Sequence, residues 1–385
     1  MPQVRVLPGV PVPSRPSDLP TGRPPFVPPA APPAGATRCR RAARVRFPAI
    51  GATLTDTRPH SSLVSSPGGR RPTLDDRRFG RGEDVAPTTH ARIERITEFI
   101  NGRLAESPRT GIAVGLSGGL DSTVTAALAA RAAGPENVTA FLMPEREGPS
   151  EDTGDGLFVS DWLGTRCVRV DVTAALDGLG VYDFLLSKLP APASEALVRL
   201  AYEARRLFSS QDPLIASLTG SPSPFVYKAA AHVKIRHRMR MVTLLFEAEK
   251  RNLLVAGAAN LTEKLTGIYT RFGVDDCADI MPIGSLYRSE VLEAARALDV
   301  PSRIADKPPA PGIIPGVRDK YRYLLGLCAE DVDAALIALE NGEEPNEIAG
   351  RLSIAPKLVR RLALVRETAL RLRELPLVPL RVEDQ

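Results

Sequence analysis

The sequence predicts an α/β fold, a parallel sheet flanked by helices and followed by further helices at the carboxyl end. Short apolar runs are the first observation, because each has the length and composition of a buried strand. The second is that helical segments separate these runs, which is typical of parallel strands joined by right-handed crossovers. The third is a glycine-rich polar turn directly after the first run. The predicted strands are residues 112–116, 138–143, 168–172 and 253–256.

Helices are predicted from apolar spacing and from residues suited to helix starts. Thr88 or Thr89 can cap the first helix, whose apolar residues fall on one face. Ser285 can cap a later helix at 290–298. Prolines recur at 177–225, which we interpret as an insertion or lid with one helical piece at 194–207. The other predicted helices are 89–105, 120–130, 150–163, 227–251, 330–341, 345–352 and 356–372, the last three within a carboxyl-terminal helical part at 320–385.

The amino-terminal residues 1–85 differ from the rest in composition. They are rich in Pro, Arg, Gly and Ser and lack a period of 2 or 3.6, so they cannot bury enough apolar surface to offset the entropy of ordering. We predict that this segment is disordered and that the domain spans 86–385. The net charge of +5 falls mostly in this segment, because Asp18 and Asp56 are the only acids before Asp75. The folded part is therefore close to neutral, which argues against binding to nucleic acid.

Cysteine usage and hydropathy bear on the compartment. The four cysteines are far apart and form no C-x-x-C pair, a pattern that suggests neither a zinc site nor a disulfide framework. No apolar run reaches the length of a membrane span, and no signal peptide is recognisable. These features predict a cytoplasmic protein without a membrane partner. The cysteines are Cys39, Cys167, Cys277 and Cys328.

The turn after the first strand, SGGLDS, has the chemistry of an anion site. The first N–H groups of a helix lack internal partners, and the helix dipole there favours negative charge. Gly118 and Gly119 allow a positive φ and a close approach to phosphate. Asp121 would repel a phosphate unless a cation lay between them, so Mg²⁺ is implied. The predicted phosphate-binding residues are Ser117, Gly118, Gly119, Leu120, Asp121 and Ser122.

Two later stretches supply further charged candidates. In HVKIRHRM, residues 232–239, one helix face carries Arg236 and Arg240 and can meet a phosphate, while Lys234 and Arg238 face solvent. A basic helix that is merely solvated remains an alternative. Glu263 follows the strand at 253–256, at the edge where α/β sheets bind ligands. Paired with Asp121, it would complete a carboxylate platform for Mg²⁺.

SGGLDS resembles the pyrophosphate loop of the N-type ATP pyrophosphatases. Together with HVKIRHRM, GAANLTEKLTGIYTRFG, PIGSLYRSEV and KPPAPGIIPG, in that order, it resembles the ammonia-dependent NAD⁺ synthetases over roughly residues 90–340. The resemblance implies an adenine nucleotide alpha hydrolase-like fold. It also implies that ATP adenylates the carboxylate of nicotinic acid adenine dinucleotide, with release of pyrophosphate, before ammonia displaces AMP.

The resemblance assigns roles to individual positions. Asp121 and Glu263 match the metal-binding acids, and 117–122 match the ATP loop. Arg236 matches an arginine of the nucleotide site, and Arg288 stands where the family has a phosphate-contacting lysine. The predicted catalytic residues are Asp121, Arg236 and Glu263, with ATP as co-substrate and Mg²⁺ as cofactor.

Several positions depart from the family pattern. Pro309 replaces a Ser or Thr that contacts phosphate, Pro311 replaces an acid, and Lys320 replaces the second acid of an Asp-Glu pair. A proline supplies neither a hydroxyl nor an N–H. Two alternatives therefore stay open. One is the same adenylation of another carboxylate, for amidation of a specialised metabolite or sulfur transfer; the other is an adenine-nucleotide-binding protein without turnover. The remaining departures are His232, Gly257, Ala258 and the segment 272–276.

The expected partners follow from this reaction: ATP, ammonia and a carboxylate substrate. A disordered segment of 85 residues could not form a glutaminase domain, so free ammonia or a separate glutaminase would supply the nitrogen. The family is dimeric, and the resemblance therefore implies a homodimer.

Overall fold

The computed structural model describes residues 88–148, 150–183, 200, 212–220, 223–311 and 317–373. The segment 1–85, predicted to be disordered, lies outside the described residues. So does the helix predicted at 194–207, except for Leu200.

The sheet has four parallel strands in the order β3-β2-β1-β4. Ile112 of β1 pairs with Val138 of β2 on one side and with Leu254 of β4 on the other, so these three strands run in step. Three predicted strands are confirmed, whereas the prediction for the third is shifted, since β3 begins at Arg166 and ends at Arg169. The bounds are β1 Ile112–Gly115, β2 Val138–Leu142, β3 Arg166–Arg169 and β4 Leu254–Ala256.

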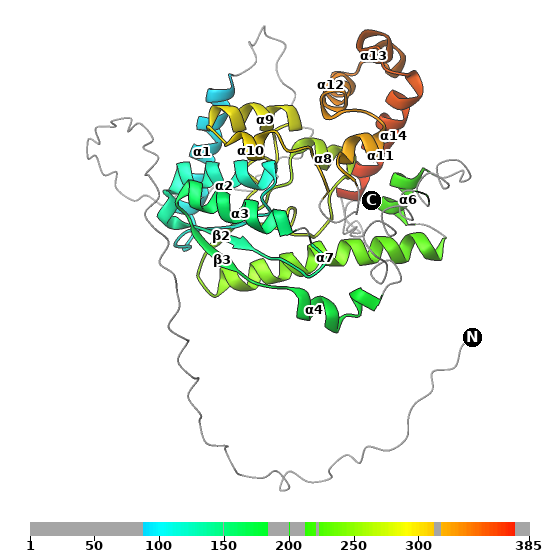
Figure 1. Ribbon diagram of the computed structural model, residues 1–385. Helices are drawn as coiled ribbons and strands as arrows, with labels where there is room; N and C mark the ends of the chain where they lie inside the picture. Colours follow the sequence, from blue (N-terminus) through cyan, green and yellow to red (C-terminus); the bar gives the residue numbers. More distant parts are fainter. Residues whose placement is uncertain are drawn as a thin grey trace, which may run out of the picture. The chain divides into compact units, whose positions relative to one another are not determined.

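Helices cover both faces of the sheet (Figure 1). On one face an apolar core joins β1, β2 and β4 to α1, α2, α3, α9 and α10. Thr88 caps α1, because its side chain accepts a hydrogen bond from the Ala91 N–H at 3.3 Å. The bounds are α1 Thr89–Ala105, α2 Leu120–Ala133, α3 Ser150–Leu163, α9 Arg288–Ala297 and α10 Ser302–Ala305.

A second apolar core covers the opposite face with α4 and α7. Leu244 of α7 and Phe141 of β2 are both buried in it. The bounds are α4 Thr173–Gly178 and α7 Pro224–Glu249, with 3-10 turns at Pro135–Asn137 and Val181–Asp183.

The carboxyl-terminal helices form a third core together with α6 and α8. Helices α12–α14 agree with the prediction, while α6, α8 and α11 are short helices that the sequence pattern did not indicate. The bounds are α6 Pro213–Thr219, α8 Leu261–Thr266, α11 Lys320–Leu325, α12 Ala329–Glu340, α13 Pro345–Leu352 and α14 Pro356–Arg373. This core lies against the carboxyl edge of the sheet through α8, which follows β4 directly.

The start of α9 corrects one sequence prediction. Ser285 does not cap this helix; the N-cap is Tyr287, whose backbone N–H donates to the Glu290 carboxylate at 2.9 Å. The helix therefore begins at Arg288, so this side chain projects from a helix start and not from a loop. Among the described helices, none combines the length and apolar character needed to span a membrane.

Candidate functional site

The loop between β1 and α2 holds its own shape through hydroxyl groups. Ser122 Oγ accepts from the Ser117 N–H at 3.2 Å and donates to the Gly119 carbonyl at 3.1 Å. Ser117 Oγ lies 3.0 Å from Ser122 Oγ and accepts from the Gly119 N–H at 3.3 Å. Gly119 is the N-cap of α2 and offers no side chain to the helix start. The first N–H groups of α2 are therefore available to an anion.

The two glycines of the loop differ in backbone conformation and in the space around them. Gly118 has φ +75°, and a Cβ there would lie 2.6 Å from Asp155 Cβ and 2.8 Å from the Asp152 carbonyl oxygen of α3. Gly119 has an ordinary φ of −86°, and a Cβ there would lie 3.3 Å from Ser117 Oγ. The expectation of positive φ is thus confirmed for Gly118 and wrong for Gly119. The loop is packed closely on α3, which fixes its backbone.

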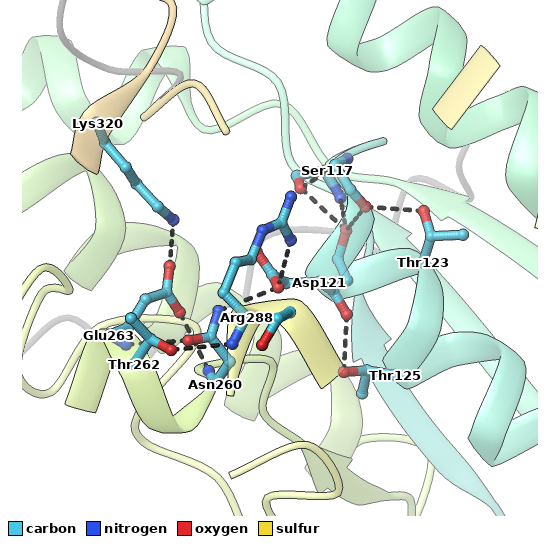
Figure 2. Close-up of polar contacts among 12 residues, drawn as sticks. Ser117, Asp121, Thr123, Thr125, Asn260, Thr262, Glu263, Arg288 and Lys320 are labelled. Carbon is cyan, nitrogen blue, oxygen red and sulfur yellow. Dashed lines mark hydrogen bonds and ion pairs between the residues drawn. The ribbon is translucent and has the colours of Figure 1, made fainter. Parts of the chain in front are cut away.

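Asp121 stands in the first turn of α2 and is held by two donors (Figure 2). Arg288 Nη1 donates to Asp121 Oδ1 at 2.8 Å, and Asn260 Nδ2 donates to the same oxygen at 3.1 Å. Burial raises the pKa of Asp121, but the charges of Arg288 and Lys320 and these hydrogen bonds outweigh it. The pKa of Asp121 therefore lies below its usual value, and the carboxylate is charged at neutral pH.

Glu263 lies beside Asp121 because Asn260 touches both. Asn260 caps α8: its side-chain oxygen accepts from the Glu263 N–H at 2.9 Å, and Glu263 Oε2 accepts from the Asn260 N–H at 3.1 Å. The other oxygen, Oε1, accepts from the ammonium of Lys320. Burial raises the pKa of Glu263; the charge of Lys320 opposes the rise and that of Asp121 adds to it. Two carboxylates from separate segments thus share one site, as predicted from their positions after β1 and β4.

A third acid faces the same site. Asp275 is 39% exposed at its side chain and lies 3.7 Å from His237 Nδ1. Enclosure by the protein, followed by the charges of Glu263 and Asp121, raises the pKa of Asp275 to about 7. Burial and the nearby Arg240 and Lys320 lower the pKa of His237 to about 4. His237 is therefore neutral at pH 7, and this pair is not an ion pair there.

Arg236 belongs to a different cluster at the same edge. Its Nε donates to Glu145 Oε2 at 3.1 Å, and Glu145 also accepts from Arg240 Nη2 at 3.2 Å and from the Tyr182 hydroxyl at 3.0 Å. Arg236 Nη2 is also within 2.5 Å of a Glu147 oxygen. The two acids of this cluster, Glu145 and Glu147, follow β2. Asp121, Glu263 and Arg288 instead meet between α2, α8 and α9. The structure thus brings together three of the four separate charged candidates.

The other face of α7 corrects the prediction that it meets solvent. Lys234 Nζ donates to the Ser217 carbonyl at 2.6 Å, and Arg238 donates to the Arg271 carbonyl at 3.4 Å. Both cations therefore fasten α7 to neighbouring segments.

Three residues of the site were not identified from the sequence: Asn260, Lys307 and Lys320. Lys307 Nζ donates to Asp155 Oδ2 at 2.6 Å and lies 3.5 Å from the Gly118 carbonyl oxygen, so it fastens the loop to α3. The capping pattern Asn-x-x-Glu at Asn260 is a signal that could have been found. Lys307 begins the KPPAPGIIPG stretch, and Lys320 is a departure from the family pattern. Their contacts could not be predicted, since only the tertiary fold brings them to the loop and to Glu263.

Asp333 of α12 connects the third core to the site. Its Oδ1 accepts from Thr262 Oγ1 at 2.5 Å, and its Oδ2 accepts from the Ser289 N–H at 2.7 Å. Thr262 Oγ1 in turn accepts a hydrogen bond from the backbone N–H of Arg288 at 2.9 Å. One buried carboxylate therefore fixes α8 and the start of α9 relative to each other.

Comparison with known proteins identifies the family. A family profile for NAD synthase matches residues 92–181 and 216–376. An NH(3)-dependent NAD(+) synthetase of Thermotoga maritima is 35% identical over 251 residues, which cover 65% of this chain and 88% of that protein. The protein of the same name from Hyperthermus butylicus is 32% identical over 286 residues, 74% of this chain and 88% of that protein.

Solved structures agree in fold. An NMN synthetase from Francisella tularensis has a TM-score of 0.55 at 23% identity, covering 76% of this chain and 99% of that chain. An NH3-dependent NAD synthetase from Campylobacter jejuni has a TM-score of 0.53 at 22% identity, covering 77% and 100%. The fold is thus adenine nucleotide alpha hydrolase-like, as predicted, and the chain belongs to the NAD synthase family.

Proposed function

We propose that this protein is an ATP-dependent ligase that adenylates the carboxylate of nicotinic acid adenine dinucleotide and then forms the amide of NAD⁺ with ammonia. The observation that carries the proposal is the meeting of Asp121 and Glu263 beside the loop at 117–122. The relatives named above are NH(3)-dependent NAD(+) synthetases, and their name supplies the substrate.

Mg²⁺ is the implied cofactor, and the donors suit it in part. Carboxylate oxygens are the hard ligands that Mg²⁺ prefers. Within the described part of the chain, both hydrogen bonds to the Asp121 side chain end on Oδ1, which leaves Oδ2 for a metal. Asp121 and Glu263 would hold the ion, and when bound it would neutralise charge on the triphosphate. The described residues contain no group of three His, Cys, Asp or Glu side chains arranged around one metal position, so water and phosphate oxygens would complete the coordination.

The chain's own residues supply the rest of the chemistry. The N–H groups at the start of α2 and the hydroxyl of Ser117 would bind the leaving pyrophosphate, while Ser122, whose hydroxyl donates to the Gly119 carbonyl, would hold the loop in place. Arg288 is positioned by Asp121 to stabilise negative charge as the α–β phosphate bond breaks. The substrate carboxylate attacks the α-phosphorus itself, and ammonia then attacks the acyl carbon and expels AMP. No protein nucleophile is required.

A second candidate keeps the adenylation but uses another carboxylate or nucleophile. Pro309 and Pro311 replace polar residues of the family pattern, and a proline cannot donate a hydrogen bond to a substrate. The loop and both acids are retained, so the changes concern substrate recognition more than ATP cleavage. The same retention disfavours a binding protein without turnover, which has no need for two acids beside a phosphate loop.

One assay separates these functions. The protein is incubated with Mg²⁺-ATP, ammonium and nicotinic acid adenine dinucleotide, and pyrophosphate and NAD⁺ are measured. We expect both products in equal amounts. Pyrophosphate without NAD⁺ would favour the second candidate, and the absence of both would indicate a protein that binds nucleotide only.

Three further features belong to the same proposal. Ammonia would come from solution or from a separate glutaminase, the protein would act in the cytoplasm, and it would form the homodimer expected of the family. Sedimentation of the purified chain would test the dimer.

A further inference from the structure

Lys320 occupies an unusual position for a lysine. It is the first residue of α11, and its ammonium binds Glu263 Oε1, with both side chains only 10% exposed. Its charge also acts on Asp121 and Asp275. A buried ammonium is costly unless a carboxylate compensates it, so Lys320 and Glu263 depend on each other.

Each of the two predicted metal ligands is already paired with a cation of the protein. Asp121 is paired with Arg288, and Glu263 is paired with Lys320. A Mg²⁺ bound to Glu263 would lie within a few ångströms of the Lys320 ammonium, and like charges at that separation repel strongly where little water intervenes.

We propose that Lys320 is a resident cation that takes the place of a divalent ion at Glu263. Mg²⁺ is then held through Asp121 alone, and the ion has one carboxylate ligand where two carboxylates are present. Lys320 thereby acts as a positioning residue that decides which acid receives the metal. This inference rests on the proposed function and revises one part of it, because Glu263 then binds the Lys320 ammonium and not the metal.

Mn²⁺ alone, added to the full chain and measured as free ion by electron paramagnetic resonance, tests this. In Lys320→Gln, Glu263 is released, and we expect Mn²⁺ to bind at least ~10-fold more tightly than to the wild type. In the double variant Lys320→Gln with Glu263→Gln, the affinity should return to within about twofold of the wild type. The matched control is Lys250→Gln, which removes a lysine paired with Glu247 at 3.0 Å on the half-exposed end of α7; its Mn²⁺ affinity should not change.

Two results would overturn the inference. One is a Lys320→Gln variant that binds Mn²⁺ no more tightly than the wild type. The other is a double variant that binds Mn²⁺ clearly more weakly, because Glu263 would then be a metal ligand in spite of Lys320. The double variant leaves neither partner charged and unpaired. Its Mn²⁺ affinity therefore tests the inference even if circular dichroism shows that the single variant is unfolded. Mn²⁺ binding needs no turnover, so a protein that shows this pattern yet releases no pyrophosphate contradicts the proposed function and not the role of Lys320.

Discussion

At the scale of single residues, the two carboxylates of the site are positioned by the side-chain amide of one asparagine. Asn260 donates to Asp121 and exchanges two hydrogen bonds with Glu263. The sequence indicated the two acids because each follows a predicted strand. It could not indicate Lys320, because an isolated lysine after a proline-rich loop has no pattern that predicts burial.

Asp121→Asn should reduce pyrophosphate release at least ~100-fold, because the neutral amide is a poor Mg²⁺ ligand and no longer fixes Arg288. A coupled pyrophosphate assay measures this. Asp161→Asn, on the outward part of α3, is the control and should behave as the wild type. Near-normal release from Asp121→Asn would remove Asp121 from the mechanism.

Asp275 predicts a pH dependence of stability. Its pKa is raised to about 7 in the folded protein, above the value of about 3.9 expected for an unfolded chain. The folded state therefore binds the proton more tightly, and this contribution to stability is lost as the pH rises from about 4 through 7. Asp275→Asn cannot titrate and so does not lose this stability. The melting temperature of the variant minus that of the wild type should therefore increase between pH 5 and pH 8. A constant difference over this range would show that Asp275 does not titrate there.

At the scale of elements, the loop between β1 and α2 is the best predicted part and β3 the least. The apolar runs of β1, β2 and β4 are buried along their length, so the apolar pattern locates them. β3 and β4 are the two edge strands, but only β3 has exposed residues, Arg166 and Arg169, and so has no such pattern. The short helix α8 was missed because a run of six residues is too brief for a helical period to show.

Gly118→Ala should destabilise the protein by about 1–3 kcal/mol, since alanine is strained at a positive φ and its Cβ would clash with α3. Urea unfolding measures the change. Gly102→Ala is the matched control: this glycine lies in α1 with no atom within 4 Å of an added Cβ, and the substitution should stabilise by about 0.5–1 kcal/mol. Equal effects of the two substitutions would contradict the close packing of the loop on α3.

At the scale of the whole molecule, composition separates 1–85 from the remainder more clearly than any motif. The family profile begins at residue 92 and the first described helix at Thr89.

Removal of residues 1–85 should leave ligase activity and the melting temperature unchanged, because α1 begins at Thr89 and the core of the first face, as formed by the described residues, starts at Ile93. Activity and far-ultraviolet circular dichroism of the shortened chain measure this. A loss of more than about half the activity with an unchanged spectrum would assign the segment a functional role.

Through the carboxylate of Asp333, the order of the carboxyl-terminal helical core affects the geometry of the site at the sheet edge. Partial unfolding of α12 on heating would break the hydrogen bond to Thr262 and leave the start of α9 mobile. Enzyme activity would then be lost at a lower temperature than the strands of the sheet. Conversely, a nucleotide bound at Arg288 should slow amide hydrogen exchange along α12, because Asp333 of that helix accepts from the Ser289 N–H.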